Sequence, residues 1–256
     1  KDGFDSWVKA LSAGQRASLA AQKFDGSGYQ VGIVPDGDEW FAVGGVASPD
    51  SLSSWCMAKL AEVLPGGTYR LASGEPGPAL HGWQTAQYRF SRYKEAKDAP
   101  GLRVLLTGEV KAIEPALAEA GAVALVCDLV NTPAEDMGPA ALESCAETIA
   151  KRHGATVKVI KGDALEKDYP MIHAVGRAAA RHHAPRLIRL EWGKDSDPLV
   201  AVVGKGVCFD SGGLDIKPAS GMLLMKKDMG GAAHAIALAD LVMGGRLPVR
   251  LHLLVP

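Results

Sequence analysis

The sequence lacks a long apolar run, an excess of charge of one sign and any close spacing of its cysteines. Its 256 residues contain no stretch of about 18 apolar residues, so we expect no transmembrane helix. A net charge of −1 gives no electrostatic basis for nucleic acid or an anionic membrane as the main partner. The four cysteines form no CxxC motif, which argues against a zinc knuckle or a disulfide framework and fits a cytoplasmic protein. The polar residues 1–14 do not have the pattern of a secretory leader.

The composition, 47% hydrophobic and 22% charged, is typical of a globular protein long enough for two domains. Residues 1–110 mix strand and helix candidates, residues 111–132 predict a linker helix, and residues 133–256 alternate helices with strands. The predicted fold is therefore α/β with two domains: a smaller N-terminal α/β domain and a second domain with a mostly parallel sheet covered by helices on both faces. The expected strands are 29–34, 39–43, 68–71, 102–106, 156–160, 187–191, 199–203 and 249–255, and the expected helices include 52–63, 80–93, 139–153, 164–181 and 229–243.

The most informative stretch lies between Val202 and Ala232, where charged residues stand among seven glycines. The apolar run Leu199–Val203 precedes it and predicts a buried strand. Charged side chains at the exit of such a strand occupy the position where α/β folds place their chemistry, and glycines there allow close backbone approach. The charged residues of interest are Lys205, Asp210, Lys217 and Asp228.

Two kinds of site compete for this stretch. Gly204-Lys205-Gly206 follows a strand, but neither the P-loop pattern nor GxGxxG is complete, which disfavours nucleotide binding. Carboxylates are ligands for divalent metals, so Asp210 and Asp228 are candidates, and Asp215 in the same loop stays open. For Asp228 alone, the alternative is a helix N-cap or first-turn carboxylate.

The two lysines also have alternative interpretations. Lys205 could be solvated or paired with Asp210; it can bind a metal only as a neutral amine, a form that burial and a nearby dication favour. Lys217 could be a surface lysine before Pro218, or a protonated group that stabilises an oxyanion.

The histidines show no HExxH spacing and are interpreted as structural or surface residues. His182 and His183 are adjacent and are expected to point in different directions on a helix, and His234 is six residues from Asp228. Ser211 lacks the GxSxG pattern, which disfavours a serine hydrolase.

The segment VGKGVCFDSGGLDIKPASGM, followed by MKKDMGGAA, resembles the leucyl aminopeptidases, also called cytosol aminopeptidases. The spacing from lysine to aspartate (+5), lysine (+7) and aspartate (+11) agrees throughout. Weaker similarities lie at Tyr88–Phe90, Asp128–Pro133 and Val175–Arg177, so the resemblance covers about residues 85–256 well and the N-terminal third in layout.

The resemblance implies a metal-dependent aminopeptidase, a hydrolase with two divalent metal ions per subunit, zinc or manganese, acting on peptides with a free N-terminus. It implies that Lys205 is an amine ligand, that Asp210 binds both metals and that Asp228 binds the same metal as Lys205. Lys217 is then the catalytic ammonium and Met225 lines the pocket for the first substrate side chain. The resemblance also implies bicarbonate as a proton shuttle, a non-catalytic N-terminal domain and a homohexamer.

One departure from the family pattern is large. The family's remaining metal carboxylates and its catalytic arginine lie in an NTDAEGR motif, which these 256 residues do not contain. Two carboxylates leave two dications under-neutralised, so we expect the natural protein to continue beyond Pro256. The alternative is a non-catalytic oligomeric scaffold or regulatory member of the same fold; a single-metal or phosphate-binding module is weaker.

Overall fold

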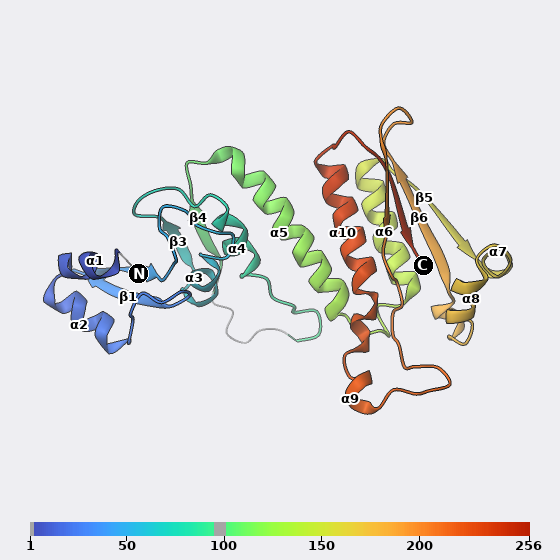
Figure 1. Cartoon of the computed structure of the whole chain (residues 1–256), viewed down its shortest axis with the longest axis horizontal. Helices are drawn as coiled ribbons and strands as arrows, with labels where there is room; N and C mark the ends of the chain where they lie inside the picture. Colours follow the sequence, from blue (N-terminus) through green and yellow to red (C-terminus); the bar gives the residue numbers. More distant parts are fainter. Residues whose placement is uncertain (1–2, 95–100) are drawn as a thin grey trace. The chain divides into compact units, whose positions relative to one another are not determined.

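The computed structural model describes residues 3–94 and 101–256. The first two residues of the polar N-terminal stretch, and residues 95–100 of the predicted N-terminal domain, lie outside this description. The chain divides into two compact units, Lys1–Gly121 (unit 1) and Ala122–Pro256 (unit 2). The boundary falls inside α5, Val110–Asn131, close to the helix that the sequence predicts at 111–132 (Figure 1).

Unit 1 contains two small sheets and short helices. β1 and β2 form an antiparallel hairpin, and β3 pairs in parallel with β4. A capping box between Ser12 and Gln15 starts the second helix. The elements are α1 Phe4–Ala10, α2 Ala13–Ala21, β1 Val31–Asp36, β2 Glu39–Gly44, α3 Ala58–Val63, β3 Gly67–Arg70, α4 Ala79–Thr85 and β4 Arg103–Leu106.

Helices α3 and α4 are shorter than the predicted 52–63 and 80–93 because local and tertiary hydrogen bonds compete with the helix. The Ser53 main chain accepts a hydrogen bond from Cys56 N in a turn before α3. After α4, the Gln87 side-chain amide accepts from Arg103 N and donates to Arg103 O, so it pairs with the first residue of β4. The buried Trp83 also donates to Arg103 O, which fixes α4 against that strand.

Unit 2 is a four-stranded sheet with helices. Its strand order is β5-β6-β8-β7. None of the helices in the described ranges combines the length and apolar character needed to cross a bilayer. The elements are α6 Pro139–His153, β5 Thr156–Lys161, α7 Gly162–Asp168, α8 Pro170–Gly176, η1 Arg181–His183, β6 Arg186–Trp192, β7 Leu199–Val203, α9 Ala219–Met222, η2 Met225–Met229, α10 Gly230–Gly244 and β8 Arg250–Val255.

The α/β class is confirmed, but the sheet is mixed where the sequence predicted it to be mostly parallel. β7 and β8 are parallel, as expected for two strands joined by the single long helix α10. β5 and β6 are antiparallel, and so are β6 and β8. Two short helices, α7 and α8, separate β5 from β6, and the pairing of Lys161 with Arg186 shows that the chain enters β6 at the end where it left β5.

β7 is not the buried strand that its apolar sequence predicts. It lies at the edge of the described sheet with β8 as its one neighbour, and Leu199 and Val203 are 61% and 65% exposed. An apolar run indicates the tendency to be buried, but the position of a strand in the sheet decides whether its faces are covered.

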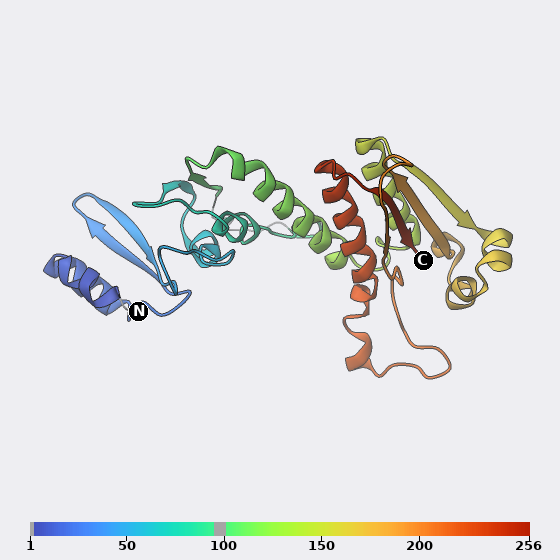
Figure 2. The ribbon, with the colours of Figure 1, turned by 45° about the horizontal axis from the view of Figure 1, so that its top comes forward.

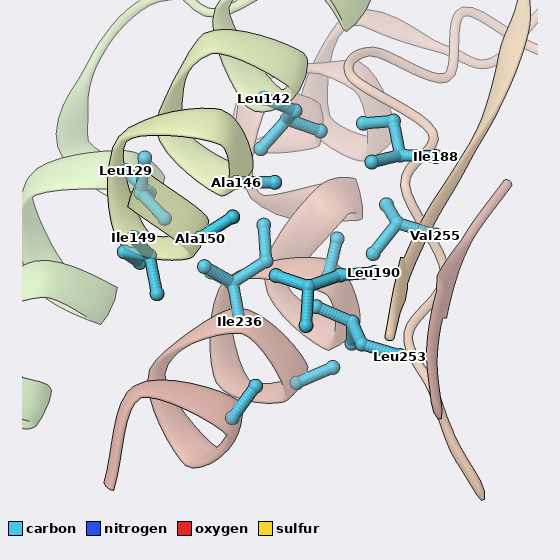
Figure 3. Packing of buried hydrophobic residues seen from close by; sticks show 14 of the residues in the cluster. Leu129, Leu142, Ala146, Ile149, Ala150, Ile188, Leu190, Ile236, Leu253 and Val255 are labelled. Atoms are coloured by element: carbon cyan, nitrogen blue, oxygen red, sulfur yellow. The ribbon is translucent and has the colours of Figure 1, made fainter. Parts of the chain in front are cut away.

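The core of unit 2 lies between the sheet and the long helices α6 and α10, which run along one face of it (Figures 1 and 2). Alanines on α10 let this helix approach closely, and Ile236 packs among residues of β6 and β8 (Figure 3). On β6, Ile188 and Leu190 belong to this cluster. Leu187 precedes Ile188 on β6 and therefore faces the opposite side of the sheet. It is buried although it does not belong to this cluster, and so is Leu165 of α7. Short helices therefore cover part of that opposite face.

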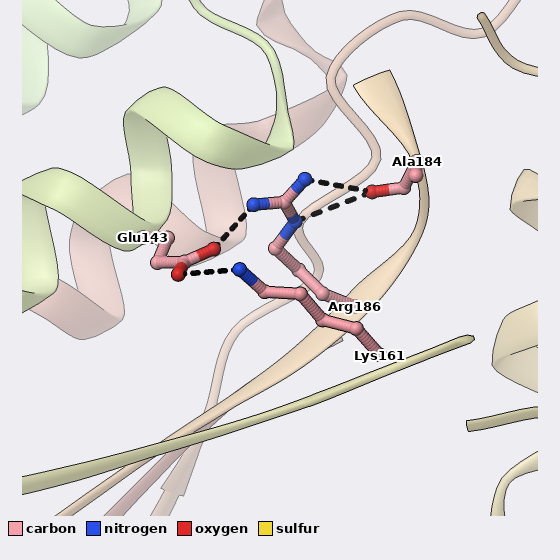
Figure 4. A network of polar contacts seen from close by, with 4 residues as sticks. All are labelled: Glu143, Lys161, Ala184 and Arg186. Atoms are coloured by element: carbon pink, nitrogen blue, oxygen red, sulfur yellow. Dashed lines mark hydrogen bonds and ion pairs between the residues drawn. The ribbon is translucent and has the colours of Figure 1, made fainter. Parts of the chain in front are cut away.

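A polar network fixes α6 to the ends of β5 and β6 (Figure 4). Glu143 accepts hydrogen bonds from Lys161, at 2.7 Å, and from Arg186. Arg186 also donates to the Ala184 carbonyl oxygen. Burial acts to raise the pKa of Glu143, but the hydrogen bonds from Lys161 and Arg186 outweigh it and the pKa is lowered.

Candidate functional site

The main chain around Lys205 is held between β8 and α10. Gly204 N donates to Leu254 O at 3.0 Å, and Gly206 N donates to Pro256 O at 2.9 Å, which extends the β7–β8 ladder past the end of β7. From the other side, Ala232 N near the start of α10 donates to Lys205 O at 2.9 Å. These three bonds place the Lys205 side chain at the strand exit, beside the N-terminus of α10.

Glycine at position 204 is required by this close approach. A Cβ atom on Gly204 would lie 2.6 Å from the Cβ of Ala235 and 2.6 Å from the carbonyl oxygen of Gly231. Real carbon contacts are never this short, and neither neighbour is a flexible side chain. Glycine at position 204 therefore lets the main chain pass close to α10.

Lys205 pairs with Asp228. Its Nζ lies 2.9 Å from Asp228 Oδ1, and the exposed fractions of the two side chains are 58% and 15%. Asp228 belongs to the 3-10 turn η2, and α10 begins after Met229 without a side-chain cap. Asp228 therefore does not N-cap α10, and Lys205 forms its ion pair with Asp228 and not with Asp210. Lys226 holds η2 in place by donating to Asn131 O at the end of α5, at 2.7 Å.

Asp210 pairs with Lys217. Lys217 Nζ lies 3.2 Å from Asp210 Oδ2, and Gly212 N donates to Asp210 Oδ1 at 2.9 Å. Gly212 has φ +101°, which glycine adopts easily and which turns the loop back toward the carboxylate. The Gly212 N–H is the largest cause of a lowered pKa for Asp210, followed by Lys217 and then Lys205. Lys205 therefore acts electrostatically on both aspartates, and the two ion pairs are together called the lysine–aspartate cluster.

The lysine–aspartate cluster fits a divalent cation. Asp228 Oδ2 is buried and has no hydrogen-bond donor among the residues that the structure describes, while Oδ1 faces the Lys205 amine. A buried carboxylate oxygen without a donor is costly in the absence of a cation. Carboxylate oxygens and a neutral amine nitrogen are donors that zinc and manganese accept. Asp215 is exposed, and no ion pair joins its side chain to the rest of the described chain.

Met225 begins the same 3-10 turn as Asp228 and is partly buried. Its predicted place in the substrate pocket stays a prediction. His234 Nδ1 lies 2.7 Å from the Gly230 carbonyl oxygen, one helical turn back on α10, in agreement with a structural role.

Sequence reasoning missed a pocket of about 720 Å³ within unit 2. Its lining includes Lys205 and Phe209 after β7, and Glu135, Val175 and His183 from earlier in the chain. Residues 134–139, 171–186 and 203–209 line this pocket together with Pro256, so no local spacing could have indicated it.

The adjacent histidines differ from expectation. The ring centroids of His182 and His183 lie 4.0 Å apart with 49° between the ring planes, so the two imidazoles stay together. The single helix predicted at 164–181 is instead two short helices, α7 and α8, and the histidines follow in the 3-10 turn η1, whose geometry differs from that of an α-helix.

Comparison with known proteins places this geometry in a family. Residues 124–256 match the catalytic domain of the cytosol aminopeptidase family, and residues 1–105 match the N-terminal domain of the M17 aminopeptidases. A probable cytosol aminopeptidase from Leifsonia xyli is 35% identical over 270 residues, which cover 96% of this chain and 54% of the relative. One from Rhodococcus opacus is 40% identical over 196 residues, 70% of this chain and 38% of the relative.

Solved structures agree. The crystal structure of a cytosol aminopeptidase from Coxiella burnetii superposes with a TM-score of 0.88 at 39% identity, covering 100% of this chain and 56% of that one. The bottromycin maturation enzyme BotP, in complex with Mn, superposes with a TM-score of 0.80 at 29% identity, covering 96% and 57%. The chain thus spans about half the length of the relatives that it matches.

Proposed function

The chain belongs to the cytosol aminopeptidase family, and on that basis we propose that it acts in a metal-dependent aminopeptidase, which hydrolyses the N-terminal residue from peptides. The observation that supports this most directly is the buried oxygen Asp228 Oδ2, which lacks a donor among the described residues beside the Lys205 amine. It lies in a cluster whose spacing is that of the family.

Three residues of the cluster would hold the metal. We propose that Asp228 and Lys205 bind one cation and that Asp210 binds two, which are zinc or manganese. When bound, two divalent cations supply an activated water and polarise the scissile carbonyl. Lys205, at 58% exposure, can turn its amine from Asp228 Oδ1 toward a bound cation without disturbing the main-chain bonds that hold it.

Lys217 would act on the substrate itself. Its ammonium group lies beside Asp210 and is one-third exposed, so it can reach a carbonyl oxygen placed above the cluster. As a protonated donor it would stabilise the oxyanion of the tetrahedral intermediate, an effect worth several kcal/mol in comparable sites. Met225, on the turn that carries Asp228, would contact the first side chain of the substrate.

The substrate class follows from the free amine of the peptide. A site that would hold this amine on a cation would exclude internal peptide bonds, which do not have one. The proposal includes the further features that the family pattern implies: bicarbonate as proton carrier, a cytoplasmic location and a homohexamer.

Metal analysis of purified variants of the active protein tests the ligand assignment. Asp210→Asn should lose both metal ions together, because an amide is a poor bridge, whereas Lys205→Ala and Asp228→Asn should lose mainly one. Asp215→Asn is the matched control, since this exposed aspartate lies in the same loop and should leave the metal content unchanged. Retention of two ions per chain in Asp210→Asn would show that the assignment is wrong.

A non-catalytic oligomeric scaffold is the second candidate. It is favoured by the pairing of two lysines with two aspartates, which balances the charges of the cluster without a cation. The two candidates predict different results for the purified protein. A scaffold binds no metal in the cluster and does not cleave an aminoacyl-peptide, even at millimolar zinc or manganese.

A further inference from the structure

A second group of metal-binding side chains lies outside the lysine–aspartate cluster. Glu135 comes from the loop between α5 and α6, and His182 and His183 come from η1. One ligand atom of each residue lies within 4.8 Å of the others. These three residues form the single group of at least three His, Cys, Asp or Glu side chains with this spacing in residues 3–94 and 101–256.

Within the described residues, the three side chains are not engaged by other polar side chains. No hydrogen bond or ion pair joins them to other side chains in the described part of the chain, whereas His173 and His153 of the same unit both lie beside carboxylates. Glu135 and His182 are exposed and His183 is partly buried, so a dissolved ion can reach all three.

The position of His183 is fixed by the loop that carries Glu135. A Cβ atom on Gly138 would lie 2.0 Å from His183 Nδ1, so the imidazole rests directly against the main chain at this glycine. Gly138 is itself buried and N-caps α6. The loop and η1 are therefore in contact before any ion binds, which reduces the entropy lost on closing the site.

The chemistry of the group selects the kind of ion. Two imidazole nitrogens and one carboxylate oxygen suit zinc, which takes three protein ligands and leaves a fourth position for water. Magnesium and calcium prefer oxygen ligands. Ligand atoms about 2.0–2.2 Å from one zinc ion lie about 3.4 Å apart in a tetrahedron, so small side-chain rotations close the observed spacing.

We propose that Glu135, His182 and His183 form a second divalent-cation site, of zinc type, separate from the lysine–aspartate cluster. Glu135 and His183 both line the pocket of about 720 Å³, so a bound ion joins two segments of its wall. The inference rests on geometry alone and does not depend on the aminopeptidase proposal.

Zinc titration of the full chain tests the site. The background is the double variant Asp210→Asn, Asp228→Asn, which removes the carboxylates of the lysine–aspartate cluster. Calorimetry or equilibrium dialysis should give one zinc ion per chain in this background, and magnesium should not bind. Adding His183→Ala, His182→Ala or Glu135→Gln should weaken zinc binding at least tenfold, since even loss of an outer partner costs 10–100-fold.

The matched control is His173→Ala, a partly buried histidine of α8 in the same unit that pairs with Glu166. It should leave zinc binding unchanged. Glu135→Gln is an exposed, isosteric change, so a folded variant is available for the test.

Selective ¹⁵N labelling of histidine gives a second measurement. Zinc should shift the ring resonances of both His182 and His183 at one equivalent and leave His173 in place. Unchanged zinc affinity in the three variants, an equal loss in His173→Ala, or a shift of one imidazole without the other would each refute the proposal.

Discussion

Replacing Glu143 with glutamine removes the charge that joins α6 to β5 and β6 while keeping the volume of the side chain. The carboxylate is 14% exposed and Arg186 is 9% exposed, so their hydrogen bond is largely shielded from water. A charge-assisted bond of this kind contributes about 1.5–2 kcal/mol. The contact with Lys161, which is 47% exposed, adds about 0.5 kcal/mol.

We therefore expect Glu143→Gln to lower the free energy of unfolding by about 2 kcal/mol. For a unit of this size the midpoint of thermal unfolding should fall by about 8 °C. Urea unfolding followed by circular dichroism measures the loss, and hydrogen exchange in β5 and β6 localises it. Glu147→Gln is the control, because Glu147 lies one turn further along α6 and is exposed.

The dependence on pH distinguishes ion pairing from packing. The pKa of Glu143 is lowered in the folded chain, so its contribution is complete above its unfolded pKa of about 4.3. The contribution is lost as the pH falls through the lowered folded value, and the difference between wild type and Glu143→Gln should shrink below about pH 4. The reasoning would be refuted if Glu143→Gln were as stable as Glu147→Gln at pH 7. It would also be refuted if the difference in unfolding free energy between wild type and Glu143→Gln grew in acid.

Three further changes have clear expected outcomes. Gly204→Ala should destabilise the chain by about 1–3 kcal/mol in urea unfolding, whereas Gly230→Ala, whose added Cβ meets nothing within 4 Å, should be nearly neutral; equal effects would contradict the close approach. Burial raises the pKa of Cys145 to about 11 and of Cys208 to about 12, so at pH 8 both thiols should react slowly with Ellman's reagent until urea unfolds the chain; rapid labelling in the native state would oppose this. In the active protein, Lys217→Ala should lower kcat about 10²–10³-fold on an aminoacyl-peptide with normal metal content, and wild-type turnover would exclude the oxyanion role.

Local signals in the sequence located most elements of unit 2. Pro139 at the first turn and Gly154, in the left-handed conformation at the C-terminal end, bound α6 where the sequence predicts it. The direction of β6 could not be predicted, because it depends on how α7 and α8 return the chain. The place of β7 at the edge of the described sheet could not be predicted either, because strand order is a long-range property.

For the site, the spacing of charged residues selected the four members of the lysine–aspartate cluster, but not their pairing. Lys205 meets Asp228 because β7, β8 and α10 converge at Gly204, and no local pattern contains that convergence. The contact between Glu135 and the two histidines has the same origin. It joins segments separated by more than forty residues through the packing of η1 against Gly138.

The edge position of β7 has a consequence for the isolated chain in solution. Along its outer side, N–H and C=O groups face away from β8, next to the exposed side chains of Leu199 and Val203. An open, apolar edge of this kind is a template on which a strand from another molecule can add. Preparations of the 256-residue chain alone should therefore oligomerise with rising concentration, and a lysine introduced at Val200 should suppress this self-association by placing a charge on the template.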